Sequence, residues 1–336
     1  MGAAQRPRVS VVVPSFNRLE SLRDTLEGLA AQTLPFDEFE VIVVDNASTD
    51  GTREAVEAYA RSAPFSLHVE RIAVNRGPAP ARNAGVARAS GSIVAFTDSD
   101  CRPDPHWLAR GLAAFADEGI AFVTGVVDFK PEQLDRLTFF ARRTVTSRDE
   151  HPTYPTANAF YRRAVFLAHG GFSETLSFPN LFGTAMEAAD TDLAWRLKEA
   201  GLRNAFVPDA IVHHEVQVTT AREWLLEPVR LYLVPALVKL HPAMRRALLS
   251  YGVFLYRGSI AYYAALALVV AALVVRPAAL GVLPLLILAL GVVKARSLRP
   301  GAVLVHAARA VLNAARIYVM AFALICGSVR FRALVL

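Results

Sequence analysis

Two carboxylates stand one residue apart at the end of an apolar run. Residues 93–97 carry apolar or β-branched side chains, and Asp98, Ser99 and Asp100 follow them directly. Carboxylate oxygens are common ligands of Mg²⁺ and Mn²⁺, which such residues hold together with the phosphates of a substrate. The pair therefore predicts a metal-assisted phosphate site. The alternative is a solvated turn, in which each Asp side chain accepts hydrogen bonds from nearby backbone N–H groups.

These carboxylates would be positioned by alternating strands and helices. The runs 9–17, 40–45, 66–72 and 91–100 have strand character, and Leu19, Leu22, Leu26 and Leu29 follow the first of them at helical spacing. Repeated β-α units predict a mostly parallel sheet with helices on both faces. Ligands of such sheets bind at the carboxyl ends of the strands. We therefore expect Pro14, Ser15, Asp45 and the Asp98–Asp100 segment to meet at one edge.

The composition separates two physically different parts. The chain has 336 residues, 54% of them hydrophobic, and a formal net charge of +6. The last acidic residue is Glu227, and the segment after it contains 13 Lys and Arg residues among long apolar runs. Basic residues interleaved with apolar stretches suit an anionic membrane surface, and we predict no nucleic acid partner. Cys101 and Cys326 stand too far apart to suggest a zinc spacing or a disulfide framework.

Four motifs resemble one enzyme family. In chain order they are VVVPSFNR, VIVVDNASTDGT, NRGPAPARNAG and AFTDSDC. Together they resemble the nucleotide-sugar glycosyltransferases of family 2, over about residues 9–218. The resemblance implies an α/β GT-A fold, which is a Rossmann-like, mostly parallel sheet with flanking helices. It also implies an inverting enzyme of the hexosyltransferase type that uses a nucleotide-sugar donor.

The resemblance assigns expected roles around the donor. Asp98–Asp100 matches the DXD motif of the family, so Asp100 and Asp98 are expected to hold Mg²⁺ or Mn²⁺. A histidine near the end of a later strand often completes this site; His213 is the preferred match, with His214 as the alternative. The remaining predicted donor-site residues are Pro14, Ser15, Asn17, Asp45, Asn46, Arg82 and Ser99. Asn17 could instead cap the following helix.

A second acidic motif is expected on the acceptor side. The stretch MEAADTDLAWRL resembles the family motif ED-x-DL-x-x-RL, and a carboxylate at a helix start can take the proton of an attacking hydroxyl. We assign this general-base role to Asp190; the alternative is capping of the helix N-terminus. Ala189 stands where the family has Glu, for which Glu187 could substitute. The other predicted acceptor-side residues are Thr156, Ala157, Asn158, Asp192 and Arg196.

The region after the catalytic motifs suggests membrane attachment. We expect a GT-A domain over residues 1–220, one or two amphipathic interfacial helices broken near Pro235 over 221–257, a transmembrane helical hairpin over 258–294, and a basic amphipathic helix over 295–336. Basic residues flank both ends of the hairpin, which places these ends and the catalytic domain on the cytoplasmic side. The prediction is thus a two-span membrane protein that acts on a lipid-linked or glycan acceptor.

Two other functions are compatible with parts of the pattern. A nucleotidyltransferase also combines a nucleotide-binding sheet with acidic metal ligands. It usually carries a Gly-rich, basic loop after the first strand, which PSFNRLES does not resemble. A catalytically inactive GT-A scaffold at the membrane is the other alternative, suggested by Ala189 alone.

Overall fold

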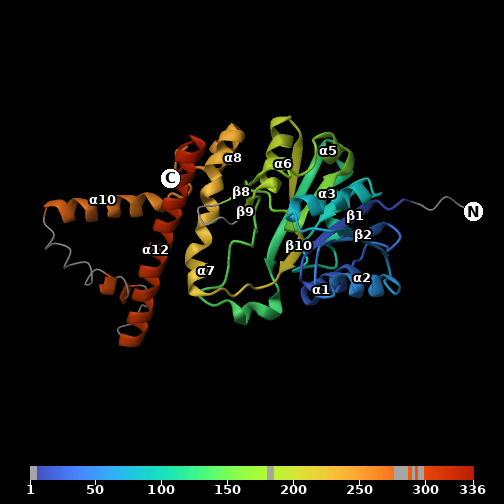
Figure 1. The fold of residues 1–336 in the computed structure, drawn as a ribbon, viewed down its shortest axis with the longest axis horizontal. Coiled ribbons are helices and arrows are strands. Elements are labelled where there is room, and N and C mark those ends of the chain that lie inside the picture. The colour runs from blue at the N-terminus through green and yellow to red at the C-terminus, as the bar shows by residue number, and fades with distance from the viewer. Residues whose placement is uncertain (1–5, 180–184, 276–286, 290–291, 294–298) are drawn as a thin grey trace, which may run out of the picture. The chain divides into compact units, whose positions relative to one another are not determined.

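A mixed sheet of eight strands, in the order β3-β2-β1-β4-β7-β6-β10-β5, forms the centre of the catalytic region (Figure 1). The computed structural model describes residues 6–179, 185–275, 287–289, 292–293 and 299–336. The strands β1, β2, β3 and β4 pair in parallel, as do β6 and β10, which confirms the predicted α/β sheet. β7 and β5 run antiparallel to their neighbours. The strand bounds are β1 Val9–Ser15, β2 Phe39–Asn46, β3 Ser66–Ile72, β4 Ile93–Phe96, β5 Cys101–Pro103, β6 Ile120–Phe129, β7 Ala159–Arg162 and β10 Arg203–His214.

Two groups of helices cover the sheet, because its central strands are apolar on both faces. One face packs against α1 (Leu19–Ala30), α2 (Thr52–Ala60) and α4 (Trp107–Ala113), whose buried side chains include Leu22, Val56 and Leu108. The other face carries α3 (Pro78–Arg88), where a Cβ on Gly85 would collide with the side chain of Val12. The absence of a side chain at Gly85 therefore lets α3 approach β1 closely.

Aromatic rings attach two further helices to the face of the sheet that carries α3. The ring of Phe166 in α5 (Arg163–Ala168) lies 5.7 Å from that of Phe96. Trp195 in α6 (Ala189–Glu199) contacts Tyr154, whose ring lies 5.4 Å from that of Phe122 on β6. These contacts fix the start of α6, which carries Asp190, against the sheet.

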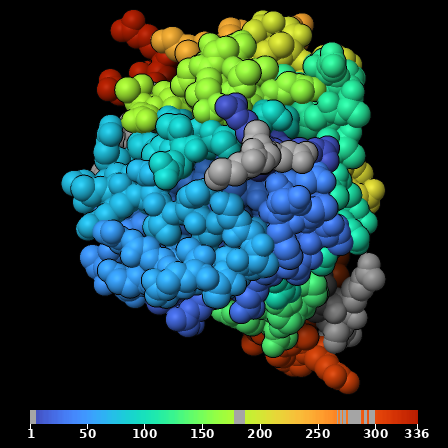
Figure 2. Space-filling view, turned by 90° about the vertical axis from the view of Figure 1, so that its right-hand side faces the viewer, coloured from blue at the N-terminus to red at the C-terminus, as the bar shows by residue number. Residues whose placement is uncertain are grey.

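The carboxyl ends of the parallel strands share one edge, as predicted. β1 ends at Ser15, which pairs in register with Asp45 of β2, and β4 lies on the other side of β1. The predicted strand 91–100 stops at Phe96, because the backbone N–H of Cys101 donates to the carbonyl of Asp98 and closes a turn. Asp98 and Asp100 consequently project from a turn between β4 and β5. In Figure 2 the blue and light-blue segments, which contain β1, β2 and β3, form one continuous face of this unit.

The chain divides into two units, of which the first comprises Met1–Ser177 and Glu187–Thr219, and the second Phe178–Met186 and Thr220–Leu336. Smaller elements complete the first: the 3-10 helices η1 Ala114–Ala116, η2 Pro131–Arg136 and η3 Thr156–Asn158. Two short strands, β8 (Ser177–Pro179) and β9 (Ala185–Glu187), pair with each other. The second unit contains α7 Ala221–Leu226, η4 Glu227–Leu233, α8 Val234–Leu240, α9 Pro242–Leu248, α10 Ser259–Val275 and α12 Pro300–Phe331.

Short helices replace the one or two amphipathic helices predicted over 221–257. Thr220 begins α7 with a capping box, since its hydroxyl accepts from the backbone N–H of Glu223 while the Glu223 carboxylate accepts from Thr220. The predicted break near Pro235 matches the boundary between η4 and α8, and Pro235 lies in the first turn of α8, where a missing N–H costs no helical bond. Gly327 lets α12 pack directly against the Tyr232 carbonyl of η4.

The described part of the tail contains one helix, α12, that is long and apolar enough to cross a membrane by its length and composition. A helix was predicted over residues 295–336, and α12 is that helix; its position at the membrane interface stays a prediction. α10 confirms a helix of 17 residues at the first predicted span. The second half of the predicted hairpin lies largely outside the described residues.

Candidate active site

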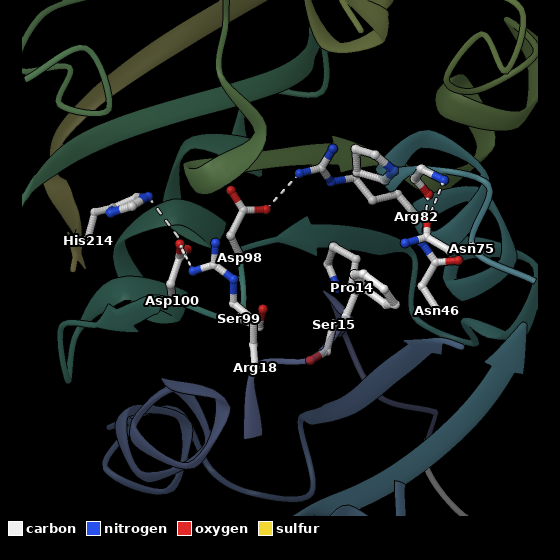
Figure 3. A pocket seen from close by; sticks show the side chains of 13 residues that line it. Pro14, Ser15, Arg18, Asn46, Asn75, Arg82, Asp98, Ser99, Asp100 and His214 are labelled. Atoms are coloured by element: carbon white, nitrogen blue, oxygen red, sulfur yellow. Dashed lines mark hydrogen bonds and ion pairs between the residues drawn. The ribbon is translucent and has the colours of Figure 1, made fainter. Parts of the chain in front are cut away.

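A cavity of about 440 Å³ opens at the carboxyl ends of the parallel strands (Figure 3). Its walls come from the ends of β1, β2 and β10, the loop after β3, the start of α3 and the turn after β4. The predicted residues that line it are Pro14, Ser15, Asn46, Arg82, Asp98, Ser99 and Asp100, with His214. The Ser15 hydroxyl is buried there and has no hydrogen-bond partner within the described structure. The structure thus brings most of the predicted donor-site residues together.

Each of the two acidic residues is paired with an arginine. Arg82 Nη2 lies 2.6 Å from Asp98 Oδ1, and Arg18 Nη1 lies 2.6 Å from Asp100 Oδ2. Arg18 directly precedes α1 and Arg82 lies in the second turn of α3, so side chains from two segments direct positive charge at one turn. Arg18 was missed in the sequence, although it stands in the VVVPSFNR motif directly after the first strand.

Asp100 is surrounded by further polar groups. His214 Nε2 lies 3.5 Å from Asp100 Oδ1, and Gln217 Nε2 donates to Asp100 Oδ2 at 3.1 Å. Ligand atoms of Asp100, Cys101 and His214 lie within 4.8 Å of one another. The carboxylate suits Mg²⁺ or Mn²⁺, whereas an imidazole is more typical of transition-metal sites. Burial, reinforced by Asp100, raises the pKa of the Cys101 thiol well above its usual value, so Cys101 is not expected to act as a thiolate ligand.

His213 was the preferred metal-site histidine, but it does not line the cavity. Successive side chains of a strand point to opposite faces of the sheet, so only one of the two histidines at the end of β10 can face the cavity. His214 lines the cavity, whereas His213 Nδ1 is buried without a partner in the described structure. The alternative, His214, is the residue beside Asp100.

Two predicted nucleotide-site residues hold the loops together. Asp45 is buried, and its Oδ1 accepts a hydrogen bond from the backbone N–H of Ser48. Asn17 has a left-handed backbone, with φ of 51°, and its Oδ1 accepts from the backbone N–H of Thr49 at 2.7 Å. Neither is among the described residues that line the cavity. Asn17 also makes no side-chain cap on α1, which begins after Arg18.

A second cavity of about 240 Å³ adjoins the first and shares Pro78, Arg82, Asp98 and His214 with it. Asp190, at the first turn of α6, lines this second cavity, as do Thr156 and Ala157. Burial raises the pKa of Asp190, and Arg82 offsets part of the rise. A carboxyl with a raised pKa beside an open cavity has the properties of a general base.

The remaining predicted acceptor-side residues have structural contacts instead. Asp192 pairs with Arg196 at 2.8 Å, and Arg196 also donates to the carbonyl of Gly171. The Asn158 side chain accepts from Trp107 Nε1 and donates to the carbonyl of Ala210, each at 2.8 Å. These polar side chains satisfy one another or the backbone, and none lines either cavity in the described chain, so their role on the acceptor side stays a prediction.

Fold and cavities together define a GT-A glycosyltransferase that transfers a sugar from a nucleotide donor, and comparison with known proteins leads to the same class. Residues 10–170 match the family model described as Glycosyl transferase family 2. The chain is 31% identical to glycosyltransferase AglE of Haloferax volcanii over 215 residues, which are 62% of this chain and 67% of AglE. This chain belongs to glycosyltransferase family 2.

Other similarities agree in fold. Mannosyltransferase PcManGT from Pyrobaculum calidifontis, solved in complex with GDP-Man and Mn²⁺, has a TM-score of 0.61 and 25% identity, over 94% of this chain and 88% of its own. S. aureus TarS 1-349 with UDP shares the fold at a TM-score of 0.51 and 21% identity, over 96% and 91% of the two chains. TuaG of Bacillus subtilis is 37% identical, but the alignment spans only 35% of this chain and 45% of TuaG.

Proposed function

We propose that this glycosyltransferase is a membrane-associated, inverting and metal-assisted enzyme that acts on a membrane-borne, lipid-linked or glycan acceptor. One observation carries the proposal. The cavity with Asp98, Asp100 and His214 adjoins the cavity with Asp190, and Arg82 lies between them in the walls of both. A donor and an acceptor can therefore meet beside a cation and a carboxylate.

The first cavity suits the nucleoside diphosphate part of the donor. Arg18 and Arg82 are within reach of the same turn and can pair with phosphate oxygens instead of Asp100 and Asp98. Asp100, Asp98 and His214 would hold Mg²⁺ or Mn²⁺. Such an ion supplies positive charge that stabilises the departing diphosphate. The Mn²⁺ bound in PcManGT supports this part of the proposal.

The second cavity suits the acceptor. Its oxygen would attack the anomeric carbon of the donor from the face opposite the diphosphate, form the new glycosidic bond and break the bond to the diphosphate oxygen. The configuration at that carbon is therefore inverted. Asp190 would receive the proton that the acceptor oxygen loses.

The long helix α12 supports attachment to a membrane. The side chains of Leu304, Val311, Phe322 and Val329 are exposed, and their spacing places them on one face of the helix. No acidic residue follows Glu227 in the chain, so the charge near this face suits anionic lipids. Whether the hairpin over 258–294 spans twice stays a prediction, as does the cytoplasmic position of the catalytic domain.

Nucleotide binding with and without cation tests the enzyme proposal. Isothermal titration of UDP, GDP and dTDP into the full-length protein should give binding that strengthens with Mn²⁺ for at least one nucleotide, and release of that nucleotide from its sugar donors should follow. Asp100→Ala should lose the Mn²⁺ effect, whereas Asp135→Ala, on the exposed side of η2, should retain it. Binding that ignores Mn²⁺ in the unmodified chain would contradict the metal-assisted mechanism.

A further inference from the structure

The cavity that carries Asp190 has an excess of negative charge. Its described lining contains three carboxylates, from Asp98, Glu187 and Asp190. Arg82 is the one Arg or Lys in that lining, and it is already paired with Asp98 at 2.6 Å. The charges of Glu187 and Asp190 therefore have no cationic side chain of their own within the lining.

Glu187 is fixed in place by the start of α3. Its carboxylate accepts a hydrogen bond from the backbone N–H of Ala79, in the first turn of that helix. Gly77 precedes the helix with φ of +92°, and a Cβ there would collide with the Glu187 carboxylate. Burial raises the pKa of Glu187, and the hydrogen bond from the helix N-terminus offsets part of this rise. Glu187 thus provides the acidic neighbour of Asp190 that the chain lacks at position 189, where Ala189 stands.

We propose that this cavity accepts a neutral, hydroxyl-bearing group, such as a sugar hydroxyl, and excludes a phosphate acceptor, with Glu187 as the second carboxylate that sets this preference. The proposal rests on the glycosyl-transfer function argued above. A phosphate brought beside Glu187 and Asp190 would meet two like charges in a half-buried site, which opposes binding. Hydroxyl groups instead donate hydrogen bonds to carboxylates.

The chemistry of the transfer leads to the same preference. A sugar hydroxyl is a weak nucleophile that must lose its proton as the bond to the anomeric carbon forms, and Asp190 can receive that proton. An ionised phosphate oxygen attacks without losing a proton, so the reaction would not require Asp190 as a base. Thr144 and Thr156 add hydroxyl groups to the same lining, which suits a polar but uncharged ligand.

Acceptor assays on the full-length protein test the preference. The protein is placed in polyoxyethylene detergent micelles, which offer no sugar hydroxyl, with Mn²⁺ and the donor identified by nucleotide release. A panel of octyl glycosides provides neutral acceptors, and farnesyl phosphate provides an anionic one. We expect glycosylated octyl glycoside and no farnesyl phosphate-linked sugar. Formation of the phosphate-linked product by the unmodified protein would overturn the proposal.

The variant Glu187→Gln tests whether the charge of Glu187 disfavours a phosphate, even if the protein glycosylates none of the octyl glycosides. Inhibition of donor hydrolysis by farnesyl phosphate should strengthen at least threefold in Glu187→Gln. It should stay unchanged in Glu118→Gln, an exposed glutamate of the same unit. Equal inhibition of the unmodified protein and Glu187→Gln would overturn the role of Glu187. If the unmodified protein does not bind any of the nucleotides, the glycosyl-transfer proposal itself fails. This outcome differs from equal inhibition of the two proteins, which contradicts only the role of Glu187.

Discussion

The guanidinium of Arg18 lies 2.6 Å from the carboxylate of Asp100, and this contact joins the start of α1 to the turn after β4. Arg18 remains 42% exposed at its side chain, whereas Asp100 is almost fully buried. The arginine can therefore turn toward a ligand while the carboxylate stays in place.

Removal of Arg18 should weaken donor binding. A hydrogen bond to a charged group contributes about 1.5–3 kcal/mol, so Arg18→Ala should raise the dissociation constant for the nucleoside diphosphate roughly 10- to 100-fold. Arg23→Ala, at an exposed position of α1, the helix that follows Arg18, is the control. Titration calorimetry measures both. Unchanged affinity in Arg18→Ala would mean that the arginine contacts only Asp100.

Asp190 should determine the acid side of the pH profile. Burial raises the pKa of Asp190, and a general base must be ionised, so transfer should decline as the pH falls through this raised pKa. In kcat/KM measured against pH, the decline should therefore begin above the usual carboxyl range. Asp190→Asn should lower kcat roughly 10²- to 10⁴-fold and leave nucleotide affinity unchanged. If Asp190→Asn keeps both the kcat of the unmodified protein and its decline in kcat/KM at low pH, Asp190 is not the base.

Gly77 should be intolerant of a side chain. Its left-handed φ of +92° and the adjacent Glu187 both oppose a Cβ, so Gly77→Ala should lower the free energy of unfolding of its unit by roughly 1–3 kcal/mol. Gly51, with φ of +83° and open space around it, separates the two causes. Urea unfolding should show a larger loss for Gly77→Ala than for Gly51→Ala. Equal losses would mean that backbone strain alone matters.

The exposed face of α12 should contact lipid. A fluorophore such as NBD attached at Phe322→Cys should shift to shorter wavelength when vesicles with anionic lipid are added, because the apolar face enters a drier environment. Leu134→Cys, at an exposed position on η2, is the control, and Cys326→Ser removes the partly exposed native thiol. An unchanged spectrum at position 322 would contradict membrane contact of this face.

The ends of the strands could be predicted from the sequence, because runs of apolar residues and the order of strands and helices along the chain determine them. Asp98 and Asp100 come directly after an apolar run, and parallel strands bring such ends to one edge. The partners of these residues could not be predicted in the same way. Arg18 meets Asp100 across 82 residues of chain, a contact that no local pattern encodes.

Local ambiguity explains where the predicted site residues and the observed contacts differ. His213 and His214 differ by one position, and only the register of β10 decides which of them faces Asp100. Asp192 and Arg196 match a motif at helical spacing, but this spacing equally favours an ion pair within one helix. Asn158 was expected in a loop on the acceptor side, whereas its side-chain amide makes three hydrogen bonds in the core.

Arg82 and Asp98 belong to the walls of both cavities, so a donor and an acceptor bound as proposed should affect each other's affinity. A diphosphate that draws Arg82 away from Asp98 changes the electrostatic potential that the acceptor meets, and an acceptor that alters this ion pair changes the affinity for the donor by the same factor. The shared ion pair would thus couple the two affinities, and steady-state kinetics with both substrates varied should show that the apparent KM of each depends on the concentration of the other.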